Sequence, residues 1–218
     1  MRTGLYVDGF NLYHAIDDLK KPYLKWLSLR RLARIASVGH ARSIEQISFG
    51  TAYFPGDFGK KKRHEAYIQA LKSEEVEVIF GHTTQEPQAC NLCGARWSQP
   101  REKETDINVA LAMYRACVAG KVDMVMLATA DTDQAATLRA IRCDFPNIKL
   151  VVLTPPGREK SKHLRDLSDI NIQITEDMLD ASVFPAMLFD ASGKLVRRPV
   201  EYAPPPGWVH WDDRPKKP

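Results

Sequence analysis

The chain has 218 residues, of which 44% are hydrophobic and 27% are charged, and its formal net charge is +4. This length fits one large domain, or a domain with an appendage, that can bury a core without disulfides or a structural metal. The mild positive charge permits a nucleic-acid partner without requiring one. We find no secretory signal and no apolar run of membrane-span length, so the four cysteines are expected in a reducing cytoplasm.

Short apolar runs alternate with segments of helical periodicity along most of the chain. Helices are predicted around residues 12–16, 27–38, 66–71, 105–118 and 134–142, and strands around residues 5–7, 44–54, 76–80, 122–128, 148–153 and 170–174. This alternation predicts an α/β fold with a mostly parallel central sheet and helices on both faces.

Two regions interrupt the alternation. Residues 81–103 contain turn residues and little periodicity, and they predict a long irregular insertion. From Pro185 onward prolines accumulate, together with Trp208 and Trp211, which predicts an extended or irregular tail that wraps the domain or contacts a second chain. We therefore divide the chain into a domain over residues 1–182 and a Pro-rich extension over residues 183–218.

The most apolar of the predicted strands ends in two aspartates, Asp131 and Asp133. Open α/β sheets bind their ligands at the carboxyl ends of the strands. Residues two apart in extended chain point the same way, so both carboxylates could converge on one cation. The alternative is that Asp133 caps the helix that follows while Asp131 is merely solvated.

Two further acids occupy comparable positions. Asp8 follows the first strand and precedes Gly9 and Asn11 at a helix start, and Asp106 lies in the first turn of a helix that Thr105 is expected to cap. Clustered carboxylates repel one another and raise each other's pKa. Mg²⁺ or Mn²⁺ relieves that repulsion, polarises phosphodiesters and activates water.

Three motifs together resemble the NYN domain family, a branch of the PIN-like ribonucleases. They are Tyr6-Val7-Asp8-Gly9-Phe10-Asn11-Leu12-Tyr13, Glu102-Lys103-Glu104-Thr105-Asp106-Ile107-Asn108-Val109-Ala110 and Thr129-Ala130-Asp131-Thr132-Asp133. The resemblance spans residues 3 to 180 and implies a PIN-like three-layer α/β/α sandwich. It departs from the family pattern at Ala130, where relatives usually have Gly, and at Gln134, where they usually have a bulky apolar residue.

The resemblance implies metal-dependent hydrolysis of RNA phosphodiester bonds. Its four-acid centre maps onto Asp8, Asp106, Asp131 and Asp133, which would bind Mg²⁺ or Mn²⁺ directly or through water, with Asn11 as the fifth catalytic residue. Asn11 is expected to hold Asp8 or the scissile phosphate, and Thr129 and Thr132 to support the acids.

Basic residues could contact the RNA backbone, although solvated surface positions are the alternative for each cluster. The candidates are Lys60, Lys61, Lys62, Arg63, Lys103, Arg158, Lys160 and Lys162. His64 and Tyr67, beside the first cluster, could stack on bases.

Cys90 and Cys93 form one Cys-x-x-Cys pair that resembles half of a zinc ribbon, with His82 as a candidate third ligand. The alternative is a chance spacing without zinc. Cys117 and Cys143 lie in helical apolar patterns and are predicted to be core residues.

Two other functions compete with the nuclease. One is a catalytically weak or inactive RNA-binding or scaffold module of the same fold, although clustered acids facing RNA disfavour it. The other is a phosphatase of the haloacid dehalogenase type, but that chemistry needs a second Asp where this chain has Phe10.

Overall fold

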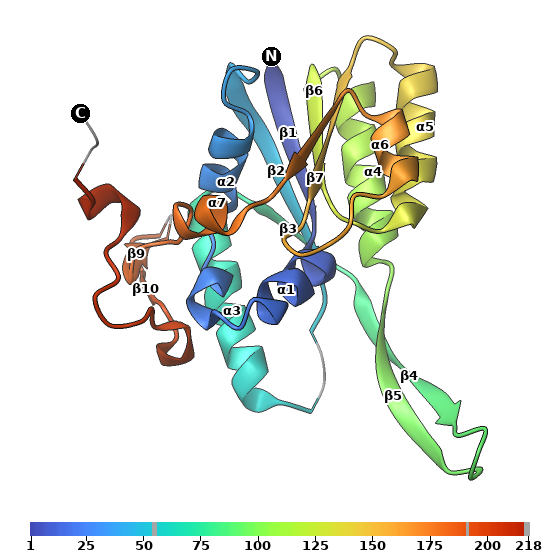
Figure 1. Cartoon of the computed structure of the whole chain (residues 1–218), viewed down its shortest axis with the longest axis vertical. Helices are drawn as coiled ribbons and strands as arrows, with labels where there is room; N and C mark the ends of the chain where they lie inside the picture. The colour runs from blue at the N-terminus through green and yellow to red at the C-terminus, as the bar shows by residue number, and fades with distance from the viewer. Residues whose placement is uncertain (54–55, 191, 216–218) are drawn as a thin grey trace.

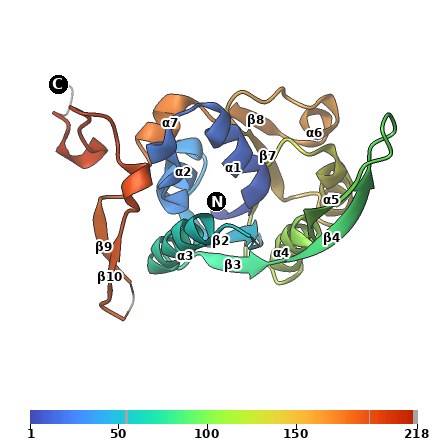
Figure 2. The same ribbon diagram turned by 90° about the horizontal axis from the view of Figure 1, so that it is seen from below.

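The computed structural model describes residues 1–53, 56–190 and 192–215, so Phe54, Pro55 and Pro218 of the predicted strand, loop and tail lie outside it. A six-stranded, fully parallel sheet with strand order β3-β2-β1-β6-β7-β8 forms its centre (Figures 1 and 2). The strands are β1 (Arg2–Asp8), β2 (Ser43–Thr51), β3 (Glu77–Phe80), β6 (Met124–Ala128), β7 (Lys149–Thr154) and β8 (Ile170–Gln173). The predicted α/β class is confirmed.

Helices cover both faces of the sheet because successive strand residues point to opposite sides. Leu5 and Val7 of β1 belong to one hydrophobic cluster, whereas Tyr6 belongs to the other. The first cluster is covered by α1 (Gly9–Asp18), α2 (Leu29–Ala36), α3 (Phe58–Ser73) and α7 (Glu176–Asp180), and the second by α4 (Thr105–Val118), α5 (Ala135–Asp144) and α6 (Lys162–Leu167) (Figure 2). The result is the expected three-layer arrangement.

The two cysteines predicted to be core residues differ. Cys117 on α4 is 4% exposed and packs in the second cluster, as predicted. Cys143 near the end of α5 is exposed, so its prediction was wrong, because it lies on the solvent side of that helix. Within the described chain, no helix combines the length and apolar character that a membrane crossing requires.

Residues 81–103 are not irregular, contrary to the prediction. They form a long antiparallel hairpin of β4 (His82–Ala89) and β5 (Arg96–Lys103) that projects from the body of the molecule (Figure 1). Its strands contain Pro87 and Pro100 and lack an apolar alternation, because a two-stranded ribbon has two edges and little core. Glu86 joins the strands through ion pairs with Arg101 and Lys103.

The C-terminal extension packs against the domain. It contains a short hairpin of β9 (Met187–Phe189) and β10 (Leu195–Arg197). Four of its buried side chains belong to the first hydrophobic cluster, namely Val183, Phe184, Val196 and Tyr202. The Trp208 indole Nε1–H donates to Asp180 of α7 at 2.6 Å. The extension therefore wraps the domain, which is one of the two arrangements expected for it.

Candidate functional site

Asp8 ends β1 and is the most buried acid of the candidate site, at 9% exposure. One carboxylate oxygen accepts a hydrogen bond from the backbone N–H of Asn11 at 3.0 Å, which caps α1. The other oxygen accepts from the hydroxyl of Thr129 at 3.0 Å. Burial raises the pKa of Asp8, and repulsion from Asp131 and Glu102 raises it further, against these two hydrogen bonds.

The ends of β1 and β6 are tied together around Asp8. The Thr129 hydroxyl also accepts from the backbone N–H of Asp131 at 3.0 Å, so the hydroxyl supports two acids at once. The side-chain oxygen of Asn11 accepts from the backbone N–H of Ala130 at 3.1 Å. The backbone N–H of Asn11 therefore binds Asp8, while its side-chain oxygen binds the loop after β6.

The chain does not stay extended from Asp131 to Asp133. Residues Thr132–Gln134 form a short 3₁₀ turn, and the Asp131 carboxylate accepts from the backbone N–H of Asp133 at 3.0 Å. Asp131 is thus the capping residue, and the prediction that Asp133 caps the following helix was wrong. The turn begins earlier than predicted because the Asp131 side chain satisfies the free N–H of its second residue, Asp133.

Gln134 explains how this turn meets α4. Its side chain is 3% exposed, and its amide N–H donates to the main-chain carbonyl of Asp106 at 2.9 Å. Gln134 therefore joins the loop after β6 to the first turn of α4, which carries Asp106. A bulky apolar residue at this position could not make this bond.

The start of α4 differs from the prediction as well. Thr105 does not cap the helix: its hydroxyl is buried without a partner in the described chain, and Glu104 at the cap position has a left-handed φ of 74°. The Glu102 carboxylate instead accepts from the backbone N–H of Thr105 at 2.7 Å. Hairpin residues therefore build this end of the helix.

These elements surround one open cavity of about 830 Å³ at the carboxyl edge of the sheet. Its lining includes all five residues predicted to be catalytic and three predicted or newly found cations, namely Asp8, Asn11, Asp106, Asp131, Asp133, Arg101, Lys103 and Arg158. Sequence reasoning missed Glu102, Glu104, Arg101 and His14 as lining residues. Three of these lie in or beside the second family motif, which was the available signal.

The carboxylates share the cavity without forming a closed set of ligands. Across residues 1–53, 56–190 and 192–215, no three acidic, histidine or cysteine side chains are close enough to hold a metal ion together. Mg²⁺ usually keeps several waters and needs only one or two protein carboxylates. Oxygen donors around a wide polar cavity fit such a hydrated ion better than a fully protein-ligated one.

The predicted RNA-binding cations fall into separate places. Lys103 pairs with Glu86 and Arg158 with Asp18, and both line the carboxylate cavity. Lys160 and Lys162 are exposed between β7 and the start of α6. The cluster Lys60, Lys61, Lys62 and Arg63 begins α3 away from this cavity, and Arg63 binds Glu201 of the extension at 2.9 Å.

The three candidate zinc ligands are not brought together. His82 lies opposite Lys103 in the strand register, at the base of the hairpin. Cys90 and Cys93 lie in its tip, beyond Ala89. Eight extended residues separate the two ends, which is about 25 Å of chain. Within one chain, the cysteines therefore form a pair without His82.

Replacing Asp8 with Asn is expected to remove a pH-dependent loss of stability. The pKa of Asp8 is raised above its usual 3.8, so between the unfolded and the folded pKa the folded chain binds more protons than the unfolded chain. The free energy of unfolding therefore falls as pH rises through the folded pKa. Asn still caps a helix but carries no charge. The stability of Asp8→Asn relative to the original chain should rise by on the order of 1 kcal/mol between about pH 3 and pH 7.

Urea unfolding at both pH values measures this change. Asp213→Asn, at an exposed position in the extension, is the matched control and should show no such trend. A stability difference for Asp8→Asn that is equal at both pH values would contradict the raised pKa.

Comparison with known proteins identifies a family, a curated relative and a solved structure of similar fold. The sequence model of the NYN domain matches residues 2–179. A curated relative, 6-hydroxy-3-succinoylpyridine 3-monooxygenase HspA of Pseudomonas putida (strain DSM 28022 / S16), is 24% identical over 77% of this chain, which spans only 64% of that protein's length. A crystal structure of a protein of unknown function from Vibrio parahaemolyticus RIMD 2210633 superposes with a TM-score of 0.55 at 17% identity, covering 81% of this chain and 94% of that one. That likeness concerns the fold.

Proposed function

Because the chain belongs to the NYN domain family, whose fold is of the nuclease type, we propose that it hydrolyses RNA phosphodiester bonds with Mg²⁺ or Mn²⁺. The observation that carries the proposal is the meeting of Asp8, Asp106, Asp131 and Asp133 around one cavity. These side chains come from three separate places in the sequence, and each is held at the cavity by its own cap, turn or helix end.

Asp131 and Asp106 are the residues we propose to hold the ion, directly or through water, with Asp8 behind them. When bound, the ion would neutralise the carboxylates, polarise the phosphodiester and make a bound water more acidic. Asp133, which lies within the turn that follows Asp131, would orient the attacking water. Thr129 keeps Asp8 and Asp131 in register through its two hydrogen bonds.

Cations in the same cavity favour a phosphate substrate. Arg101, Lys103 and Arg158 line it together with the acids. Their partners Glu86 and Asp18 are side chains that the cavity lining does not include. Such groups offset the repulsion between the carboxylates and an RNA backbone, and their contribution should weaken with added salt.

Metal removal tests the proposal. Purified chain should cleave labelled single-stranded RNA in Mn²⁺ or Mg²⁺, lose the activity in EDTA and regain it when the ion is restored in excess. The reason is that the carboxylates alone cannot neutralise a phosphodiester. RNA binding without turnover in either ion would instead support the non-hydrolytic RNA-binding module, and cleavage that persists in EDTA would contradict the metal centre.

A second candidate is the binding of a small heteroaromatic acid, the kind of compound that the name of the Pseudomonas relative contains. The observation in its favour is an apolar cavity of about 400 Å³ beside the carboxylates, which is within the size range of small-molecule sites. Saturable binding of a hydroxypyridine carboxylic acid by calorimetry, together with absent RNA binding, would favour it over the nuclease.

A further inference from the structure

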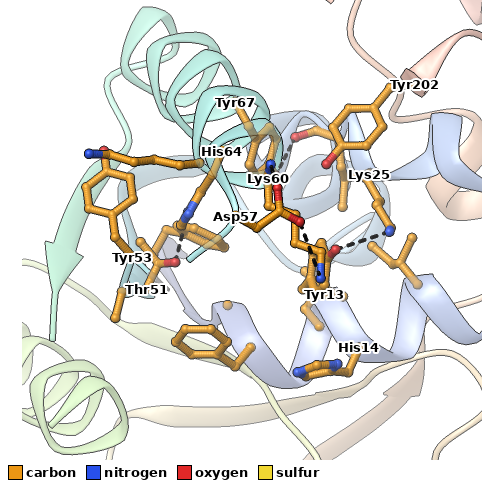
Figure 3. A pocket seen from close by; sticks show the side chains of 18 of the residues that line it. Tyr13, His14, Lys25, Thr51, Tyr53, Asp57, Lys60, His64, Tyr67 and Tyr202 are labelled. Carbon is orange, nitrogen blue, oxygen red and sulfur yellow. Dashed lines mark hydrogen bonds and ion pairs between the residues drawn. The ribbon is translucent and has the colours of Figure 1, made fainter. Parts of the chain in front are cut away.

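The second cavity lies between α1, the end of β2, α3 and the C-terminal extension (Figure 3). It shares two lining residues, Phe10 and His14, with the carboxylate cavity. Residues four apart lie on the same side of a helix, so one side of α1 borders both cavities. The two cavities are therefore neighbours at α1.

The floor of this cavity is apolar and its walls are aromatic. Leu12, Ile16 and Phe49 are at most 5% exposed and form part of the first hydrophobic cluster. Tyr13 and Tyr53 are 37% and 36% exposed, so both rings remain accessible. In Figure 3, Tyr53 and His64 lie on one side of the cavity, and Tyr13, Lys25 and Tyr202 on the other.

Both accessible rings are held in place by neighbours. Tyr53 stacks on Phe80 with ring centres 5.1 Å apart and an angle of 25°, and it meets the edge of His64 at 5.2 Å. The Lys25 ammonium lies 4.5 Å from the centre of the Tyr13 ring. Rings positioned in advance lose little conformational freedom when a planar ligand stacks on them.

Polar groups occur at the edges of the cavity. His64 Nε2 lies 3.0 Å from the Thr51 hydroxyl, and burial lowers the pKa of His64, which favours the neutral ring at neutral pH. The ammonium groups of Lys60 and Lys61 form exposed ion pairs with Asp57 and Glu65, each at 4.0 Å. Lys61 also lies 5.8 Å from the centre of the Tyr53 ring. Exposed pairs of this kind contribute little to stability, so both lysines can exchange these partners for an anionic group at the edge of the cavity.

We propose that this cavity receives an unpaired nucleobase of the RNA strand whose phosphodiester lies in the carboxylate cavity. The inference rests on the proposed function, and it adds a base-binding subsite to it. An apolar floor with aromatic walls fits the face of a base, and Lys60 and Lys61 fit its phosphate. Because Phe10 and His14 line both cavities, neighbouring nucleotides of one strand would occupy the two subsites.

An abasic scan tests the subsite without relying on cleavage. Short single-stranded RNAs, each with one abasic nucleotide at a different position, are titrated against the chain in EDTA. One or two adjacent positions should each cost at least about fivefold in affinity, because stacking on an aromatic side chain is lost there. Tyr53→Ala and Tyr13→Ala should each bind intact RNA at least about fivefold more weakly than the original chain. In these variants, an abasic nucleotide at the same positions should cause no further loss of affinity.

Phe189→Ala, which removes a 67% exposed ring from β9, is the matched control and should leave the scan unchanged. If Tyr53→Ala does not fold by circular dichroism, Tyr53→Leu keeps the bulk and removes only the ring. A flat scan in the original chain, or position-dependent losses that persist in the tyrosine variants, would overturn the proposal. Binding of a free pyridine carboxylic acid in this cavity without any loss of RNA affinity would also overturn the proposal. The cavity would then hold a ligand other than the RNA base.

The outcomes are distinguishable from those for cleavage. Position-dependent binding without turnover in Mn²⁺ supports the base subsite and contradicts hydrolysis. Turnover with a flat scan supports hydrolysis and contradicts the subsite.

Discussion

Asp131→Asn is expected to lower the rate of RNA cleavage by about 100- to 1,000-fold, which is typical for the loss of one group that stabilises charge in a reaction. The substitution keeps an oxygen that can accept from the backbone N–H of Asp133, so the turn after β6 should persist. It removes the charge that the metal ion and the attacking water would meet. The initial rate on labelled single-stranded RNA at saturating Mn²⁺ measures the effect.

The control for this variant is Asp213→Asn, which makes the same chemical change at an exposed position of the extension. It should cleave at the rate of the original chain. Equal rates for Asp131→Asn and the original chain would remove Asp131 from the reaction. Unfolding in urea should show that Asp131→Asn stays within about 1 kcal/mol of the original, since the change is conservative and partly exposed.

Trp26→Ala is expected to destabilise the fold by about 3–5 kcal/mol, the range for loss of a fully buried large aromatic side chain. Trp26 is 0% exposed, and its ring packs against Tyr67 and Phe184. Its indole N–H donates to the carbonyl of Pro185 at 2.9 Å, and its own carbonyl accepts from the N–H of Phe184 at 2.8 Å. The substitution therefore opens a cavity and releases the start of the extension together.

Urea unfolding followed by circular dichroism measures this loss, because the signal does not depend on the removed tryptophan. Trp211→Ala is the matched control: its ring is 48% exposed in the extension, and its loss should cost less than about 1 kcal/mol. A loss below 1 kcal/mol for Trp26→Ala would mean that the extension is not anchored through this residue.

The layered fold could be predicted because most of its elements carry a local pattern. The helix at Thr105–Val118 and the apolar strands around it follow from periodicity alone. The hairpin over residues 82–103 could not be predicted in this way, since its prolines and polar residues give no alternation. Pairing between β4 and β5 is decided by contacts across the ribbon, such as Glu86 with Lys103.

The sequence predicts which acids line the site, but not the contacts that hold them there. Placing Asp8 and Asp131 at adjacent strand ends follows from the parallel sheet, and β1 does pair directly with β6. The contacts that shape the cavity are long-range and leave no local signal. The bond from Gln134 to Asp106 and the bond from Thr129 to Asp8 join segments 28 and 121 residues apart.

Helix α1 is a common wall of two cavities, and that position has a thermodynamic consequence. A ligand that favours one placement of α1 changes the affinity of the neighbouring cavity when the ligand of that cavity also binds the placements unequally. By linkage, the factor is the same in both directions. The proposed ion among the aspartates and the proposed ring between Tyr13 and Tyr53 would therefore be reciprocal effectors, to the extent that Phe10 and His14 move when either one binds.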